Sequence, residues 1–180
     1  MFETLAILGN NEDSIRMDTR AGSPIENSRS TLAPPKNAEF KFIGFVKEHG
    51  SGSWQVRAPI DIHYNCAGHV WASRRTSIYK LQEWAKILRE DGYSRTNKPI
   101  PDDIVIYYMD DGSMTHVARV HQLIPSDIGP PIAVVVSKWG ETGGEVCHFV
   151  HEVPHSIRAK YEFWTDRQGD PPTIERSIVV

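Results

Sequence analysis

The stretch DIVIYYMDDGSMTHVARVHQL, residues 103–123, decides the fold class of this protein. DIVIYYM (103–109) is rich in β-branched and aromatic residues, and HVARVHQL (116–123) alternates apolar with polar positions, as strands do. The sequence DDGS (110–113) between them is typical of a tight turn. The stretch therefore predicts two sequential strands that pair antiparallel.

The same strand-like composition continues toward the C-terminus. IAVVVSKW (132–139) is almost continuously apolar, while EVCHFVHEV (145–153) and AKYEFWTD (159–166) have further strand patterns. Together with the first two segments they predict an antiparallel sheet of about five strands.

Upstream, TSIYKLQEWAKILRED (76–91) has the period of a helix. Its apolar residues at this spacing are Ile78, Leu81, Ala85 and Leu88. Thr76 or Ser77 is available as the N-cap, and Gly92 is a stop signal. A helix followed by sequential strands indicates the α+β class.

The N-terminal region divides near residue 39. EFKFIGFV (39–46) alternates and predicts a strand, whereas residues 9–38 are dense in Asn, Ser, Pro and Gly and poor in large apolar side chains. We therefore expect a loose arm over 1–38, one domain over 39–167 and a tail over 168–180.

The composition excludes several classes of partner. The chain has 180 residues, 20 basic and 23 acidic, and a net charge of −3, without the basic cluster that nucleic acid or an anionic membrane requires. Its first residues lack the basic start and apolar run of a secretory signal. With only two cysteines, the sequence predicts a cytoplasmic protein with free thiols.

FVHEVPH (149–155) contains the HExxH spacing of zinc peptidases, with His151, Glu152 and His155. That motif needs a helix to bring both histidines onto one face. Pro154 would break such a helix at a cost of about 3 kcal/mol. We therefore expect a strand that ends at a proline turn, and zinc chemistry remains only an alternative.

A stronger candidate lies in IHYNCAGHVWASRR (62–75). Asn65 is a good N-cap, which places Cys66 at the first position of a helix. Free N–H groups and the helix dipole there favour thiolate over thiol and can later bind an oxyanion. The alternative is an inert buried cysteine.

A cysteine nucleophile requires a base, and His116 at the start of its strand is the first candidate. A strand can hold an imidazole rigidly against a neighbouring helix end. His69, three residues after Cys66, and His63, just before it, are the rival candidates.

The motifs NCAG, PDDIVIYY and THVARV, in this order, resemble those of NlpC-type cysteine peptidases of the papain-like group. SKWGETGGEVCH is similar to a segment of uncharacterised bacterial domains that have an Asn-Cys start and a histidine strand. The resemblance covers about residues 60–166. It implies an α+β papain-like fold, in which an N-terminal helix carrying Cys66 packs on the antiparallel sheet and His116 is the base.

This sequence departs from the NlpC-type pattern at several positions. Asn65 replaces the usual Asp, and Ala67 replaces Ser. Asp102 stands in place of Gly, and Arg119 in place of an apolar residue.

The family also implies a polar third residue on the next strand. If residue 123 lies opposite 132, Ser137 shares the face of His116, so Ser137 is preferred and His148 is the reserve. Tyr64 is a candidate to donate a hydroxyl to the oxyanion site, with Gln55 as a weaker one.

Taken together, these motifs predict a cysteine hydrolase that cleaves an amide or peptide bond through an acyl-enzyme, without metal or organic cofactor. The resemblance implies a bacterial cell-wall peptide as substrate. A chain without an export signal would meet such a peptide only if another route exported it, for example as a toxin-type effector, and a cytosolic protein or a small amide is equally consistent with the sequence. A zinc peptidase and an inactive papain-like binding module are the alternatives, and the oligomeric state is left open.

Overall fold

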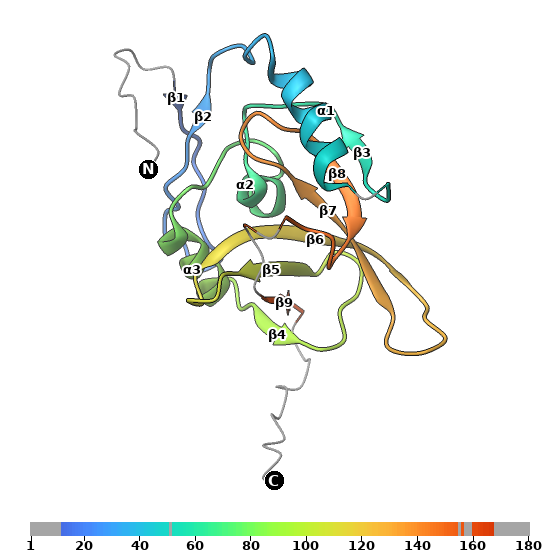
Figure 1. Ribbon diagram of the computed structural model, residues 1–180. Helices are drawn as coiled ribbons and strands as arrows, with labels where there is room; N and C mark the ends of the chain where they lie inside the picture. Colours follow the sequence, from blue (N-terminus) through green and yellow to red (C-terminus); the bar gives the residue numbers. More distant parts are fainter. Residues whose placement is uncertain (1–11, 51, 155, 157–159, 168–180) are drawn as a thin grey trace.

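A computed structural model describes residues 12–50, 52–154, 156 and 160–167 of the chain (Figure 1). This part has an α+β fold with three helices, in agreement with the class expected from the sequence. The helices are α1 (Ala38–His49), α2 (Cys66–Trp71) and α3 (Leu81–Glu90). The strands are β1 (Glu12–Asp13), β2 (Arg29–Ser30), β3 (Gln55–Ala58), β4 (Ser94–Thr96), β5 (Ile104–Tyr108), β6 (Met114–Ile124), β7 (Ile132–Lys138), β8 (Glu145–Phe149) and β9 (Lys160–Thr165).

Seven strands form one antiparallel sheet in the order β3-β8-β7-β6-β5-β9-β4, and β1 pairs with β2 separately. The five strands predicted over 103–166 are confirmed. The expectation of about five strands is too low, because β3 and β4 add an edge on each side. Both are short and largely exposed, so they have no alternating apolar pattern that reveals a strand in sequence.

Each face of the sheet has its own core. On β5, Ile104 and Ile106 belong to a cluster that includes side chains of α2 and α3, whereas Val105 and Tyr107 belong to a second cluster that includes Phe42 of α1. Successive side chains of a strand point to opposite faces, which explains this division. The expected packing of the Cys66 helix on the sheet is therefore observed, with α2 next to β6 in Figure 1.

The strand predicted over 39–46 is wrong, because this segment lies inside helix α1. Phe42, Phe45 and Val46 follow one another at helical spacing and pack against the second core. Phe40, which made the segment look alternating, is 82% exposed. The helix that carries Cys66 is consequently the second one in the chain.

The helix predicted over 76–91 is confirmed over Leu81–Glu90, and Gly92 after it has a φ of 78° that suits a glycine stop. Neither Thr76 nor Ser77 caps it, because the helix begins later, after Lys80. No helix in the described part of the chain is long and apolar enough to cross a membrane.

Residues 12–38 lie against the domain, so a loose arm is the wrong description for this part. Ile25 is only 4% exposed in the first core, and the backbone of Ser28 pairs with that of Ser77. The Thr19 hydroxyl donates to Glu90 over 2.8 Å. The composition predicted a loose segment because it does not reveal that one buried isoleucine and specific polar contacts hold these residues against the domain. Residues 1–11 and 168–180 lie outside the described residues.

The pairing of β6 with β7 differs slightly from the expected register. Leu123 faces Ala133 rather than residue 132, but an irregularity between Val120 and Gln122 shifts the pairing so that Arg119 faces Val136. The shift restores the predicted register at Arg119. Continued along both strands beyond this pair, the same register places His116 opposite Trp139.

Candidate active site

Asn65 fixes the start of α2. Its Oδ1 accepts hydrogen bonds from the backbone N–H groups of Gly68, over 2.9 Å, and Ile78, over 3.1 Å. Its Nδ2 donates to Ile78 O over 3.0 Å. The predicted cap is thus confirmed, and the same side chain also joins the helix to the segment before α3.

Cys66 is the first residue of α2 and is partly exposed. Its side chain packs against the first core, and the backbone N–H groups of Val117 and Ala67 lie within hydrogen-bonding reach of Sγ. The β6–β7 ladder ends at Arg119, so the N–H of Val117 has no partner in β7. The structure therefore brings the thiol to the strand that carries His116.

The thiolate expected at Cys66 is not favoured in this conformation. Burial raises the pKa of the thiol above its ordinary value, and this effect exceeds the opposing influence of the two N–H groups and of the Lys138 charge. Helix α2 spans only six residues. The prediction of a lowered pKa is therefore wrong for this conformation, because loss of water outweighs local dipoles.

His116 is 5% exposed and lies among aromatic rings. Its imidazole stacks on Trp139, with ring centroids 4.6 Å apart, and contacts Tyr107 of the second core. Its Nε2 is buried and has no hydrogen-bond partner among the described residues. Burial, followed by the charges of His148 and His69, lowers the pKa of His116 to about 3, so the ring is neutral near pH 7.

The backbone of Val117, which follows His116, contacts the Cys66 sulfur. Among the described residues, however, no hydrogen bond joins the thiol to the imidazole. The two side chains pack with different cores. The sequence thus placed the residues on neighbouring elements correctly, but the direct contact that it predicted is absent from this conformation.

Ser137 and His148, the alternatives for the third residue, bind each other. Ser137 Oγ lies 2.8 Å from His148 Nε2, and His148 Nδ1 lies 2.8 Å from the carbonyl oxygen of Phe149. A carbonyl only accepts, so Nδ1 carries the proton and the serine hydroxyl donates to Nε2. Burial lowers the pKa of His148 to about 4. Trp139 contacts the rings of both His116 and His148.

Tyr64 belongs to a polar network around Glu145 that the sequence did not reveal. The Glu145 carboxylate accepts from Tyr64 OH over 2.8 Å, from His69 Nδ1 over 3.0 Å and from the guanidinium of Arg74. Burial alone would raise its pKa, but the hydrogen bonds from His69 and Arg74 hold the pKa well below its usual range. The Tyr64 hydroxyl is thereby committed to Glu145, which argues against an oxyanion role.

The other candidate residues lie in different surroundings. His63 is exposed and pairs with Asp61, its Nδ1 lying 2.7 Å from the carboxylate. Gln55 lies on the exposed edge strand β3. His69 serves the Glu145 network. None of these three contacts Cys66 through a hydrogen bond among the described residues.

Lys138 is a charged residue near the site whose burial the sequence did not reveal. It lies at the end of β7, opposite Glu145 of β8, and its side chain is fully buried. It also interacts electrostatically with Cys66. Position 138 lies on the face opposite to Ser137, as the preferred register implied.

The HExxH segment has no helix over the described residues 149–154, which end strand β8 and form turns. Glu152 accepts hydrogen bonds from the Ser53 hydroxyl and from the backbone N–H of Phe149. His155 lies outside the described residues. Within the part of the chain that the structure describes, no three potential ligands are grouped for a metal ion.

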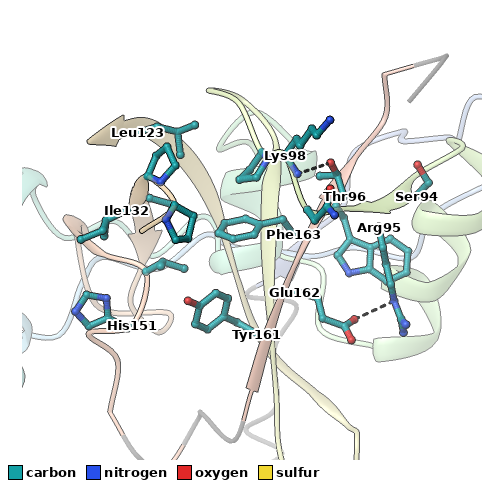
Figure 2. Close-up of a pocket in the computed structure, with 17 residues that line it drawn as sticks. Ser94, Arg95, Thr96, Lys98, Leu123, Ile132, His151, Tyr161, Glu162 and Phe163 are labelled. Carbon is teal, nitrogen blue, oxygen red and sulfur yellow. Dashed lines mark hydrogen bonds and ion pairs between the residues drawn. The ribbon is translucent and has the colours of Figure 1, made fainter. Parts of the chain in front are cut away.

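A cavity of about 1230 Å³ opens near the strands β4 and β9 (Figure 2), and Cys66 does not belong to its lining. Figure 2 shows Tyr161 and Phe163 on one side and Ile132 with Leu123 on the other. A smaller cavity of about 390 Å³ is lined by Trp139 and by Phe42 and Phe45 of α1. Of these two cavities, the smaller one adjoins the aromatic rings around His116 through Trp139.

No protein-family model matches this chain, and searches of curated proteins and of solved structures found no match either.

Proposed function

We propose that this protein is a cysteine-dependent hydrolase of amide or peptide bonds with a papain-like, NlpC-type architecture. Cys66 is the nucleophile and His116 is the base. The observation that supports this best is the packing of the first residue of α2 against the histidine strand, with Sγ in reach of the Val117 N–H group. This contact brings the thiol to the backbone of Val117, the residue that follows the proposed base in the sequence.

The proposed reaction is acyl transfer to water. His116 removes the proton from Cys66, the sulfur attacks the carbonyl carbon, and the main-chain N–H of Cys66 binds the oxyanion. The imidazolium then protonates the leaving amine, and water hydrolyses the thioester. No metal or organic cofactor takes part.

The low pKa of His116 imposes a condition on this mechanism. An imidazole with a pKa of about 3 is a poor base at neutral pH. The proposal therefore requires that substrate binding moves the ring out of its stack on Trp139 toward Cys66, where the ring gains water or a charged partner. In this movement Ser137 and His148 keep their hydrogen bond, and His148 keeps its contact with Trp139.

The experiment is a burst assay with p-nitrophenyl acetate as acyl donor. The wild-type protein should release nitrophenolate in a burst equal to the enzyme concentration and carry one acetyl group on Cys66. C66S should abolish the burst, and H116A should slow it at least about 100-fold. H63A is the matched control, because His63 is exposed and pairs with the carboxylate of Asp61. A burst that H116A leaves unchanged would exclude His116 as the base.

A papain-like binding module without activity is the second candidate. The raised pKa of Cys66 and the missing thiol–imidazole hydrogen bond favour it. It predicts no burst with any acyl donor. A zinc peptidase has no support among the described residues.

The substrate class follows only from the resemblance. A cell-wall peptide and a host protein cleaved by a toxin-type effector both present the required amide bond, and a cytoplasmic location suits a protein substrate.

A further inference from the structure

Lys138 is a buried cation that forms no ion pair with any residue in the described part of the chain. Its side chain is fully buried, and Nζ donates to the carbonyl oxygens of Gly140, over 2.7 Å, and Glu141, over 3.4 Å. The ammonium group also lies 5.2 Å from the centre of the Tyr64 ring. Across the described residues, no carboxylate oxygen lies within ion-pair distance of Nζ.

Glu145, which lies opposite Lys138 in the sheet, is already satisfied by other partners. Lys138 and Glu145 face each other across β7 and β8, yet the carboxylate binds Tyr64, His69 and Arg74 instead. A charge held in a protein interior without a counter-ion is unfavourable because it has lost its hydration, so such residues are rare unless they serve a function. This arrangement leaves the positive charge available for another anion.

Cys66 is a nearby group that can become an anion, because it begins α2, which packs beside β7, and follows Tyr64, whose ring lies under the ammonium group, by two residues. The Lys138 charge lowers the pKa of the thiol, and the thiolate raises that of the amine. The other ionisable groups that act on the amine are Asp61, Glu145 and Glu141, and each of them favours its charged form. Burial nevertheless lowers the pKa of Lys138 to about 8, so the ammonium form dominates at neutral pH.

We propose that Lys138 is a positioning residue of the Cys66 site, whose buried ammonium group stabilises the thiolate that forms when the thiol loses its proton. This inference deepens the proposed hydrolase function, and the positioning role of Lys138 in the reaction rests on that function. The coupling between the two groups does not require a substrate, and it can be measured separately.

The experiment follows the alkylation of Cys66 by iodoacetamide between pH 5 and pH 10, with peptide mass spectrometry to separate Cys66 from Cys147. K138M removes the charge and keeps the length of the side chain. It should shift the midpoint of the profile upward by about one unit and slow alkylation about tenfold at pH 7.5. K41M is the matched control, because Lys41 is exposed and its loss changes the net charge equally. Equal profiles for K138M and the wild type would overturn the inference.

A second measurement covers the case in which K138M does not fold. The same coupling must appear at Lys138, because an interaction between two sites is reciprocal. NMR titration of the Lys138 side chain should show a lower midpoint in C66S than in the wild type. Identical midpoints would contradict the proposal.

The two proposals fail in different ways. A shift in K138M without an acyl burst supports the Lys138–Cys66 coupling and rejects the hydrolase. A burst that depends on His116, together with an unshifted K138M profile, supports the hydrolase and rejects the role of Lys138.

Discussion

The substitution N65A tests how the start of α2 is held. Asn65 is 9% exposed, and its Oδ1 satisfies the backbone N–H groups of both Gly68 and Ile78. Alanine would leave these two donors buried and unpaired. Each such group costs about 1 to 3 kcal/mol, so we expect a loss of roughly 3 kcal/mol in the free energy of unfolding. Ile78 O would remain satisfied, because it also accepts from Trp84 Nε1 over 2.9 Å.

The assay is urea denaturation followed by tryptophan fluorescence, with the free energy of unfolding extrapolated to water. N65D keeps an acceptor for both N–H groups and should cost only about 1 kcal/mol. N97A is the surface control, because Asn97 is exposed, and it should change the stability by less than about 0.5 kcal/mol. A loss below about 1 kcal/mol in N65A would refute the view that this side chain secures the helix.

Three further predictions concern packing and protonation. G68A should destabilise the protein by about 3 kcal/mol in the same assay, because a Cβ at Gly68 would lie 1.8 Å from the carbonyl oxygen of Thr76; stability like that of the wild type would contradict this. S137A removes the partner of His148 Nε2 and should cost about 1 to 3 kcal/mol, and an unchanged urea midpoint would disprove it. His116 and His148 have folded pKa values of about 3 and about 4, below the ordinary 6.5, so their stabilising effect is complete above pH 6.5 and declines as the pH falls toward those values. Denaturation at pH 5 should give a free energy of unfolding roughly 3 kcal/mol lower than at pH 7, and equal values at the two pH values would show that the rings are not held neutral.

The sequence by itself determined the central sheet and the elements that meet at the site. The strands over 103–166 were predictable because their alternation reflects burial on both faces of a sheet. Asn65 was predictable as a cap because the interaction is local, between residues three positions apart. Cys66 and His116 were therefore assigned correctly to a helix start and to the strand against which it packs.

Elements with an ambiguous pattern were decided by tertiary packing. The α1 segment satisfies both a strand and a helix period, and only the contact of Phe42 with the second core selects the helix. Residues 12–38 are ordered by contacts with distant partners, such as Ser28 with Ser77, which composition does not reveal.

The chemistry of the site was decided by tertiary structure alone. The ionisation of Cys66 and His116 depends on how much water surrounds each group. Burial raises the pKa of the thiol and lowers the pKa of the imidazole, which is the opposite of what a thiolate beside an imidazolium requires. Lys138 and Glu145 lie opposite each other only because β7 and β8 pair in one register. Local sequence specifies which residues begin a helix or a strand, but the solvation of a side chain depends on segments far away in the chain.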